Sequence, residues 1–350
     1  MHSVFGNDLH LQLLNKKGEN GSGFKQEGWD WNRYPGATII YLPFKELEPK
    51  KPLLAFRSNE TFAGATELNG NGIFGMILNE ADGSNADGEI GNNGFPGKLK
   101  AKKSIFSFSD KIISIGTNIS SVDNKNPTQT NLFQTFLEDK KELLFTQNGK
   151  LKSFPTKGNL PANKTGENWI IDNYGNGYHI LSSDVINYKK ETQNSYHNKY
   201  SVNTGKMNAK GKGVTKTKGN YATAWINHGL APKNANYQYI IYPFNTESEI
   251  DDFEEKVKKD TSYTIIQADE NAHIVKDEKT NTTGYVIFDK NFKLKEGLLK
   301  SVSKPSLLMT QNLSATKIEI SLVQPDLNFE EYSKNRFKNF KKLLACNKTY

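Results

Sequence analysis

The chain has 350 residues, with 46 Lys and Arg against 38 Asp and Glu, which gives a formal net charge of +8. This length suits two ordinary domains or one large β-domain, and it excludes a miniprotein that depends on disulfides or metals. The single cysteine, Cys346, excludes an intramolecular disulfide, and no apolar run is long enough to span a membrane. On charge alone, a nucleic acid, a sulfated polysaccharide and an acidic membrane are all candidate partners.

Short β-type runs recur along the chain and are separated by Gly, Asn, Asp and Pro. Aromatic residues make up 11% of the sequence, which suits the half-buried surfaces of pleated sheets. The spacing favours antiparallel hairpins over βαβ units, and we predict a large antiparallel sandwich with few helices. In chain order the runs are ATIIYLP, GIFGMIL, KSIFSFSDKIISIGTNI, NWIIDNYGNGYHILS, YQYIIYPF, SYTIIQA, TGYVIFD and KIEISLVQP.

Two of these runs are predicted hairpins, and two other segments are predicted helices. Ser109–Lys111 interrupts one run, and Gly175–Gly177 permits a tight turn in another. Thr246 can cap a helix in which Glu249 completes a capping box. The apolar face of that helix would consist of Ile250, Phe253 and Val257, and a second helical pattern covers residues 328–346.

Two stretches raise functional questions. Residues 199–221 contain six lysines and no acid, which predicts a mobile loop that is either a solubilising insertion or a flap that grips a polyanion. The stretch QEGWDWNRYPGATIIYLP, residues 26–43, places two of the four tryptophans beside an acid and an arginine. The residues alone leave it open whether this stretch is a structural clasp or the wall of a site.

Motifs for several kinds of chemistry are missing from the sequence. The six histidines show no metal-ligand spacing, and no phosphate-binding glycine loop or serine-hydrolase elbow is present. The sequence therefore predicts no metal and no cofactor. No RNA-binding signature accompanies the basic charge, and we expect neither nucleic acid nor a membrane as the partner.

Five blocks occur in the order of a known family. EGWDWNRYPGATIIYLP, FAGATELNGNGIFGMIL, LKAKKSIFSFSDKIISIGTNISS, WIIDNYGNGYHI and AWINHGLAPKNANYQYIIYP together resemble the C-terminal half of the chondroitin ABC lyases of polysaccharide lyase family 8. The resemblance covers roughly residues 23–328. It implies a large antiparallel β-supersandwich of the galactose-mutarotase-like type, followed by a smaller C-terminal β-domain.

The resemblance also implies a chemistry, which is β-elimination at a uronic acid of a glycosaminoglycan. That reaction needs a group to neutralise the carboxylate, a base for the C5 proton and an acid for the leaving oxygen. In the family, His, Tyr and Arg come from an α/α-toroid domain, and a Glu comes from the sandwich. Only about 25 residues precede the first block here, so we expect the toroid to be absent from this chain and to be supplied by a partner polypeptide.

Glu67 is the catalytic position that the resemblance carries over. It lies in GATELNGNGIFGM, where Leu-Asn-Gly follows it, whereas in the family the glutamate is followed directly by glycine. From the residues alone, a glutamate beside a turn is usually a solvated surface group. Arg57, ten residues upstream, is a candidate to bind sulfate or carboxylate through its planar guanidinium, although a solvated loop arginine is the common case.

Other residues of the matching blocks are interpreted as structural. His228 belongs to a scaffold block, because the family's catalytic histidine comes from the toroid, and Trp225 and Tyr237 are expected in the core. The resemblance places the stretch at residues 26–43 where the chain leaves the toroid. This favours the clasp over the site wall, with Trp29 and Trp31 packed at the junction and a possible Asp30–Arg33 ion pair.

The expected organisation has three parts: residues 1–28 as the segment leaving the toroid, 29–300 as the supersandwich, and 301–350 as a truncated C-terminal β-domain with a basic helical tail. Three functions follow as alternatives. The chain is the sandwich portion of a chondroitin or dermatan sulfate lyase that is inactive without a toroid, a non-catalytic module that binds sulfated polysaccharide, or an inert remnant. The resemblance implies a secreted or periplasmic location, although no signal peptide is visible.

Overall fold

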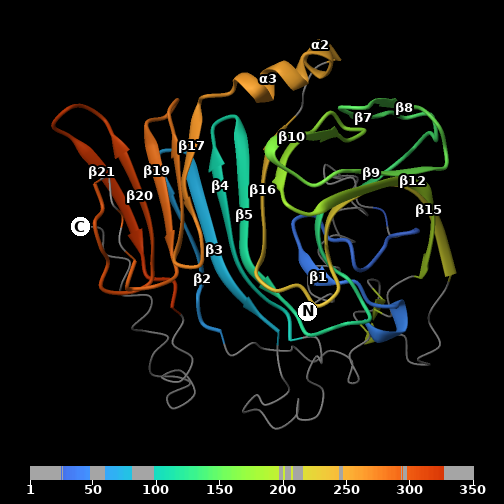
Figure 1. Cartoon of the computed structure of the whole chain (residues 1–350), viewed down its shortest axis with the longest axis horizontal. Coiled ribbons are helices and arrows are strands. Elements are labelled where there is room, and N and C mark those ends of the chain that lie inside the picture. The colour runs from blue at the N-terminus through green and yellow to red at the C-terminus, as the bar shows by residue number, and fades with distance from the viewer. Residues whose placement is uncertain are drawn as a thin grey trace, which may run out of the picture.

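The strands form three main antiparallel sheets stacked as layers (Figure 1). The computed structural model describes residues 25, 27–47, 60–80, 98–196, 200–201, 206–207, 216–243, 247–292, 294 and 298–326. The first sheet has the order β1 (Thr38–Ile40), β6 (Thr128–Phe136), β15 (Lys216–Gly229), β12 (Val185–Tyr196) and β9 (Thr156–Leu160).

The central sheet is the largest, and the C-terminal sheet covers one of its faces. The central sheet has nine strands in the order β2 (Ala63–Leu68), β3 (Asn71–Asn79), β4 (Lys100–Phe108), β5 (Lys111–Ser120), β16 (Ala235–Tyr242), β11 (Gly177–Ser182), β10 (Asn163–Ile171), β7 (Leu144–Thr146) and β8 (Gly149–Leu151). The C-terminal sheet has the order β17 (Tyr263–Ala268), β18 (Ala272–Asp277), β19 (Thr282–Ile287), β20 (Ser306–Asn312) and β21 (Ile318–Val323). A small two-stranded sheet pairs β13 (Tyr200–Ser201) with β14 (Lys206–Met207).

Each face of the central sheet contributes to a separate hydrophobic core. Because side chains alternate along a strand, neighbouring residues point into opposite cores. Ile180 and Tyr237 pack in the core that the central sheet shares with Phe133 and Ile186 of the first sheet. On the other face, a second core joins the central and C-terminal sheets through residues that include Phe106, Ile113, Ile240, Val286 and Leu307. The antiparallel sandwich predicted from the sequence is therefore confirmed.

Both predicted hairpins are present. In the first, β4 and β5 pair so that Phe108 lies opposite Lys111. In the second, β10 and β11 pair so that Ile171 lies opposite Gly177, and Gly175 in the turn has a φ of 82°. The glycine is needed there because residues with a side chain rarely adopt this backbone conformation.

The predicted helix at residues 246–257 is divided into two short helices, α2 (Glu247–Asp251) and α3 (Phe253–Lys259). The break falls at Asp252, whose φ of −97° and ψ of 5° leave the helical region. Phe253 and Val257 are buried as predicted, whereas the proposed cap at 246 lies outside the described residues. No helix in the described part of the chain is long and apolar enough to cross a membrane.

The basic stretch at residues 199–221 is not a loop throughout. Lys216–Tyr221 begin β15 and pair with β12 from Tyr196 to Glu191, which corrects the loop prediction for these six residues. The polar sequence conceals a strand because an N-terminal segment covers its alternate residues: the amide of Gly28 donates to Thr217 Oγ1 at 3.0 Å. Residues 199, 202–205 and 208–215 lie outside the described part of the chain.

The C-terminal sheet runs across residue 300. Strands β19 and β20 lie on either side of that position in the sequence and are paired. Ile287 lies opposite Ser306 at one end of the pairing, and Thr282 lies opposite Gln311 at the other. The boundaries expected at 28 and 300 stay predictions, since sheet pairing alone does not define units that fold independently. The helical tail predicted at 328–346 lies outside the described residues.

Candidate functional site

Residues 27–37, which we call the clasp, cross the outer face of the first sheet. Trp29 and Trp31 are buried in a small aromatic cluster with Tyr221 of β15. Trp31 donates its indole N–H to the carbonyl of Tyr196 at 2.9 Å, and Ser195 of β12 donates to the carbonyl of Trp29. Both tryptophans therefore hold the clasp against β12 and β15, as the sequence suggested for a structural role.

Asp30 and Arg33 form the ion pair predicted from the sequence, with Arg33 Nε 3.2 Å from Asp30 Oδ2. The guanidinium lies over the ring of Trp225 at 3.6 Å and donates to Asn131 Oδ1 at 3.1 Å. Burial lowers the pKa of Arg33, and the neighbouring Asp30 carboxylate opposes that shift. The pair is thus a buried link between the clasp and the first sheet.

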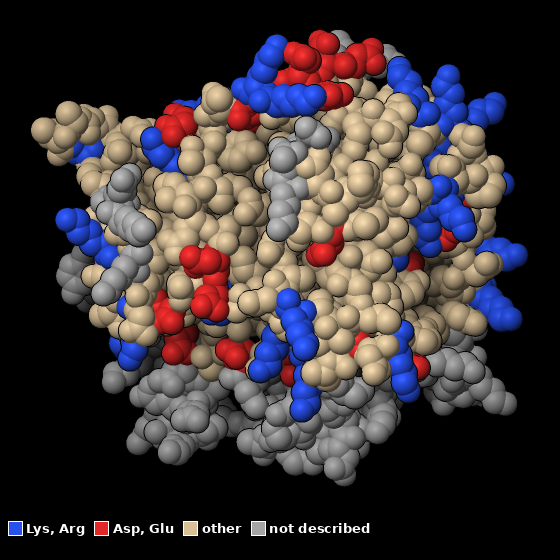
Figure 2. Space-filling view, viewed as in Figure 1, with Lys and Arg blue, Asp and Glu red and all other residues tan. Residues whose placement is uncertain are grey.

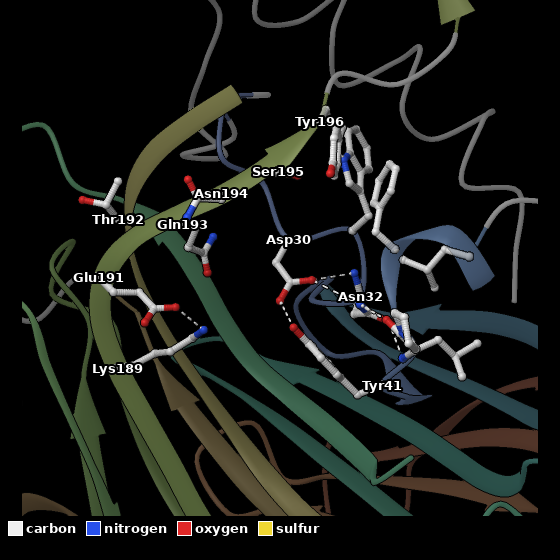
Figure 3. A pocket seen from close by; sticks show the side chains of 15 residues that line it. Asp30, Asn32, Tyr41, Lys189, Glu191, Thr192, Gln193, Asn194, Ser195 and Tyr196 are labelled. Atoms are coloured by element: carbon white, nitrogen blue, oxygen red, sulfur yellow. Dashed lines mark hydrogen bonds and ion pairs between the residues drawn. The ribbon is translucent and has the colours of Figure 1, made fainter. Parts of the chain in front are cut away.

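The clasp also forms one wall of a pocket with a volume of about 360 Å³ (Figure 3). The opposite wall is β12, from which Lys189, Glu191 and Gln193 extend toward Asp30 and Tyr41 (Figure 3). This stretch is therefore both a structural clasp and the wall of a pocket. Its two tryptophans bind it to the first sheet, and Asp30 lines the cavity. The remaining lining residues are Trp31, Asn32, Leu42, Pro43, Phe44, Leu47, Thr192, Asn194, Ser195 and Tyr196.

Hydrogen bonds hold the clasp wall of the pocket in one arrangement. Asp30 Oδ2 accepts from the Tyr41 hydroxyl at 3.0 Å, and Asp30 Oδ1 accepts from the amide of Asn32 at 3.0 Å. Asn32 in turn binds the backbone of Leu42, both as donor and as acceptor. Burial, followed by the nearby Asp30 carboxylate, raises the pKa of Tyr41 to about 12, so this hydroxyl stays protonated at neutral pH.

Glu67 lies on a different part of the molecule, near the end of edge strand β2. It is exposed and pairs with Gly72 across a hairpin in which Asn69 and Gly70 have φ values of 50° and 78°. Two residues with positive φ are typical of the tight turns that join antiparallel strands. The Leu-Asn-Gly sequence that departs from the family pattern is thus the end of β2 and its turn.

The carboxylate of Glu67 has an open setting. Its register partner on β3 is Gly72, and the partner of Gly72 on β4 is Ser107. All three lie on the same face of the sheet, and Ser107 is also exposed. Among the described residues, no side chain forms a hydrogen bond or ion pair with Glu67. Strands β2, β3 and β4 contain no His, Tyr or Arg, so none of these types adjoins Glu67 within the three strands.

The clasp contacts this same face further along β4. Lys103, which shares a face with Ser107, donates from Nζ to the carbonyl of Gly36 at 2.6 Å. Burial lowers the pKa of Lys103 to about 8. The second candidate residue, Arg57, lies outside the described residues, so its position relative to Glu67 stays a prediction.

Both ring nitrogens of His228 are bonded within the protein. Nδ1 lies 2.6 Å from Asp184 Oδ2, and Nε2 lies 2.8 Å from Thr130 Oγ1. The side chain is fully buried, which supports the structural interpretation. Among the described residues, no group of three His, Cys, Asp or Glu side chains could hold a metal ion.

Sequence reasoning missed the pocket because its two walls are far apart in the chain. A signal was present in NYKKETQNSY, residues 187–196, where polar residues occupy both faces of a long strand. A strand in a sandwich normally alternates apolar and polar residues. Lys189, Glu191 and Gln193 lie on the outer face of this strand. The polar run could therefore have indicated that β12 lines a polar cavity.

Comparisons with known proteins place this fold. The sequence profile of the polysaccharide lyase family 8 super-sandwich domain matches residues 26–254. The chondroitin sulfate ABC endolyase of Proteus vulgaris is 31% identical over 91% of this chain and 29% of its own length. A chondroitin sulfate ABC exolyase of Bacteroides thetaiotaomicron is 30% identical over 87% of this chain and 27% of its own length. The chain spans less than a third of these relatives.

Solved structures show the same architecture. A Paenibacillus xanthan lyase superposes with a TM-score of 0.65 at 23% identity, over 86% of this chain and 26% of its own. A chondroitinase AC lyase superposes with a TM-score of 0.62 at 21% identity, over 85% of this chain and 39% of its own. These similarities concern the fold.

Proposed function

Because the chain belongs to polysaccharide lyase family 8, we propose that it is the sandwich portion of a lyase that acts on a glycosaminoglycan such as chondroitin or dermatan sulfate. The extent of the match carries this proposal: the family profile covers residues 26–254, and the similarity to the Proteus vulgaris endolyase covers 91% of the chain. A match of this extent includes the clasp as well as the strands.

In this proposal the chain supplies part of a β-elimination site. Removing the C5 proton of a uronate requires a neutralised carboxylate, a base and an acid for the leaving oxygen. Glu67 orients these groups from an exposed strand end, and Arg57 binds a carboxylate or sulfate of the polymer. The His, Tyr and Arg come from a toroid, which a partner polypeptide or another part of a longer chain provides.

The first experiment measures the chain by itself. Purified chain is incubated with chondroitin sulfate, and the ultraviolet absorbance of the unsaturated uronate product is followed. We expect no sustained turnover, because the described strands beside Glu67 contain no His, Tyr or Arg. Turnover by the chain alone would contradict the need for a toroid.

A second experiment tests Glu67 in an assembled enzyme. The matching segment of the Proteus vulgaris endolyase is replaced by this chain, and the activity of the hybrid is compared with that of its Glu67→Gln variant. We expect the variant to lose activity by about 100-fold or more, as removal of a group that acts in the transition state does. Glu278→Gln, which changes an exposed glutamate on the C-terminal sheet, is the control, and equal activities of the two variants would remove Glu67 from the site.

A separate observation favours the second candidate function, a non-catalytic module that binds sulfated polysaccharide. Lys and Arg side chains gather over the region of β8, β9 and β12 (Figure 2). In the segments that form or adjoin these strands, Lys140, Lys141, Lys152 and Lys157 are exposed and form no ion pair with a described acidic residue. The Lys140 ammonium lies 5.2 Å from the ring of Phe154, which brings Lys140 close to the segment that contains Lys152 and Lys157. We call these four residues the lysine surface.

A further inference from the structure

The pocket between the clasp and β12 has no part in the proposed β-elimination. Glu67 is not among its lining residues, and the pocket opens on the outer face of the first sheet. Its volume of about 360 Å³ falls near the lower end of the range for small-molecule sites. A cavity of this size holds one sugar-sized ring.

Each charged side chain that lines the pocket in the described part of the chain has a partner of opposite charge. The Asp30 carboxylate pairs with Arg33 at 3.2 Å, and the Lys189 ammonium pairs with Glu191 two residues along β12. An anionic ligand would therefore meet two carboxylates and find no unpaired cation among the lining residues that the structure describes. The lysine surface, by contrast, has cations unpaired among the described acids. The paired charges of the pocket therefore disfavour the binding of a uronate or a sulfate.

One buried acceptor in the pocket wall has no donor. Gln193 is 5% exposed, and its Nε2 donates to the carbonyl of Gly28 at 2.9 Å and to Gln134 Oε1 at 2.8 Å. These two acceptors fix the orientation of the amide, because the opposite orientation would place oxygen against oxygen. The Gln193 Oε1 is left buried without a hydrogen-bond donor among the described residues.

The rest of the lining offers acceptors and aromatic rings. The carboxylates of Asp30 and Glu191 accept hydrogen bonds only, whereas sugar hydroxyls can donate. At one end of the pocket, the rings of Phe44 and Tyr196 stack at 4.6 Å and present apolar surface. Hydroxyl donors together with an apolar ring face are the combination that a sugar offers.

We propose that this pocket binds an uncharged sugar ring, with hydroxyls donating to the Glu191 carboxylate and with the ring lying between β12 and the Asp30–Tyr41 wall. Such a subsite would hold an uncharged saccharide on the outer face of the first sheet, separate from Glu67. Tyr41 supports it as a neutral hydroxyl, since its pKa is raised to about 12.

The experiment observes the pocket directly in the full-length chain. The ¹⁵N-labelled protein is titrated with galactose, glucose or N-acetylglucosamine, and the indole N–H resonance of Trp31, assigned through Trp31→Phe, is followed. This indole lines the pocket and is bonded to the carbonyl of Tyr196 at its wall. We expect a saturable shift with at least one of these sugars and none with galacturonate, which differs from galactose by a carboxylate.

Two matched pairs of variants identify the groups responsible. Glu191→Gln is compared with Glu278→Gln, since Lys189–Glu191 and Lys276–Glu278 are both ion pairs two residues apart at strands. Lys189→Met is compared with Lys157→Met. Lys189 on β12 lies opposite Lys157 on β9, and of these two only Lys189 lines the pocket. We expect Glu191→Gln and Lys189→Met to weaken binding about fivefold or more, as loss of a hydrogen bond or its supporting ion pair does, and the controls to change it less than about twofold.

Three results would overturn the proposal: no shift of the Trp31 resonance with any of the three sugars, an equal shift with galacturonate, or equal effects of a pocket variant and its control. Each is independent of the lyase proposal. Loss of activity in Glu67→Gln leaves sugar binding in the pocket unchanged, and an inactive hybrid enzyme leaves the titration of the isolated chain valid.

Discussion

His273 shows how a single buried side chain can link two layers. Its ring lies between the central and C-terminal sheets, where Nδ1 is 2.7 Å from Ser104 Oγ and Nε2 is 2.9 Å from Thr117 Oγ1. Burial lowers the pKa of His273 to about 3, and the Asp269 carboxylate only partly opposes this shift. The folded protein therefore holds a neutral imidazole well below the pH at which a free histidine becomes charged.

This produces a defined pH dependence of stability. Between about pH 6.5 and 3 the unfolded chain binds a proton at this residue that the folded chain does not, so the free energy of unfolding falls as the pH falls through that window. We expect His273→Gln to reduce the loss of stability between pH 7 and 4.5 by about 2–3 kcal/mol, because about two pH units of this window lie below 6.5 and each contributes about 1.4 kcal/mol. Urea unfolding of the unaltered protein and the variant at pH 7 and 4.5 measures this loss of stability. Equal losses in the two proteins would show that His273 does not determine the pH dependence of the unfolding free energy.

At the residue scale the sequence predicted contacts within short segments better than long-range ones. The Asp30–Arg33 pair is three residues apart and was expected, whereas the partners of Gln193 lie at positions 28 and 134. Glu67 was predicted as a site residue through a family resemblance and stays a prediction, and its exposed position is set by Gly72 and Ser107 of the neighbouring strands. The pocket combines residues 30–47 with 189–196, and no local pattern connects them.

Two glycines of strand β3 have opposite environments. A Cβ at Gly75 would lie 2.4 Å from Val286 Cγ1 and 3.0 Å from Leu307 Cδ2, whereas a Cβ at Gly72 would have only the Thr66 carbonyl oxygen within 4 Å, at 3.8 Å. Gly75 therefore allows the C-terminal sheet to pack closely against β3. Gly72 lies on the same strand but faces open space, beside Glu67.

We expect Gly75→Ala to lower the free energy of unfolding by about 1–3 kcal/mol, because the added methyl group overpacks the contact between the sheets. Gly72→Ala is the matched control and should change it by less than about 1 kcal/mol, since a Cβ there meets no side chain. Chemical denaturation measures both variants. If they were equally stable, close packing at Gly75 would not limit the approach of the two sheets.

Elements with strong local signals were predicted, and elements defined by long-range contacts were not. Gly175 marked the turn between β10 and β11, and runs rich in Ile and Phe on either side of Ser109–Lys111 marked β4 and β5. The start of β15, by contrast, reads KTKGNY, which is typical of a loop. It is a strand because β12 supplies its hydrogen bonds and the clasp covers Thr217 and Gly219.

The whole molecule carries its excess positive charge unevenly. The lysine surface is unpaired among described acids, whereas Lys256, Lys258, Lys259 and Lys317 each form an ion pair with a glutamate. A polyanion is attracted by local unpaired charge more than by net charge when salt screens distant charges within about 10 Å. Variants of these two groups of four lysines can therefore distinguish binding at a local surface from attraction by net charge.

We expect the chain to be retained on a chondroitin sulfate column and to elute with salt. Changing the four residues of the lysine surface to Gln should lower the salt concentration needed for elution. The same change at Lys256, Lys258, Lys259 and Lys317 should lower it less, although the net charge changes equally. Equal shifts would argue against a specific surface, and no retention of the unaltered chain at low salt would contradict the binding function.

The clasp has a consequence for how the chain folds during synthesis. Gly28 bonds to Thr217, 189 residues later in the sequence, and Trp29 bonds to Ser195. At about 5–20 residues per second, the ribosome would need about 10–40 s to make the partner strand after the clasp has been made. Trp29 and Trp31 therefore stay without their final contacts until β12 and β15 have been made, and the pocket forms only when the clasp closes over the first sheet.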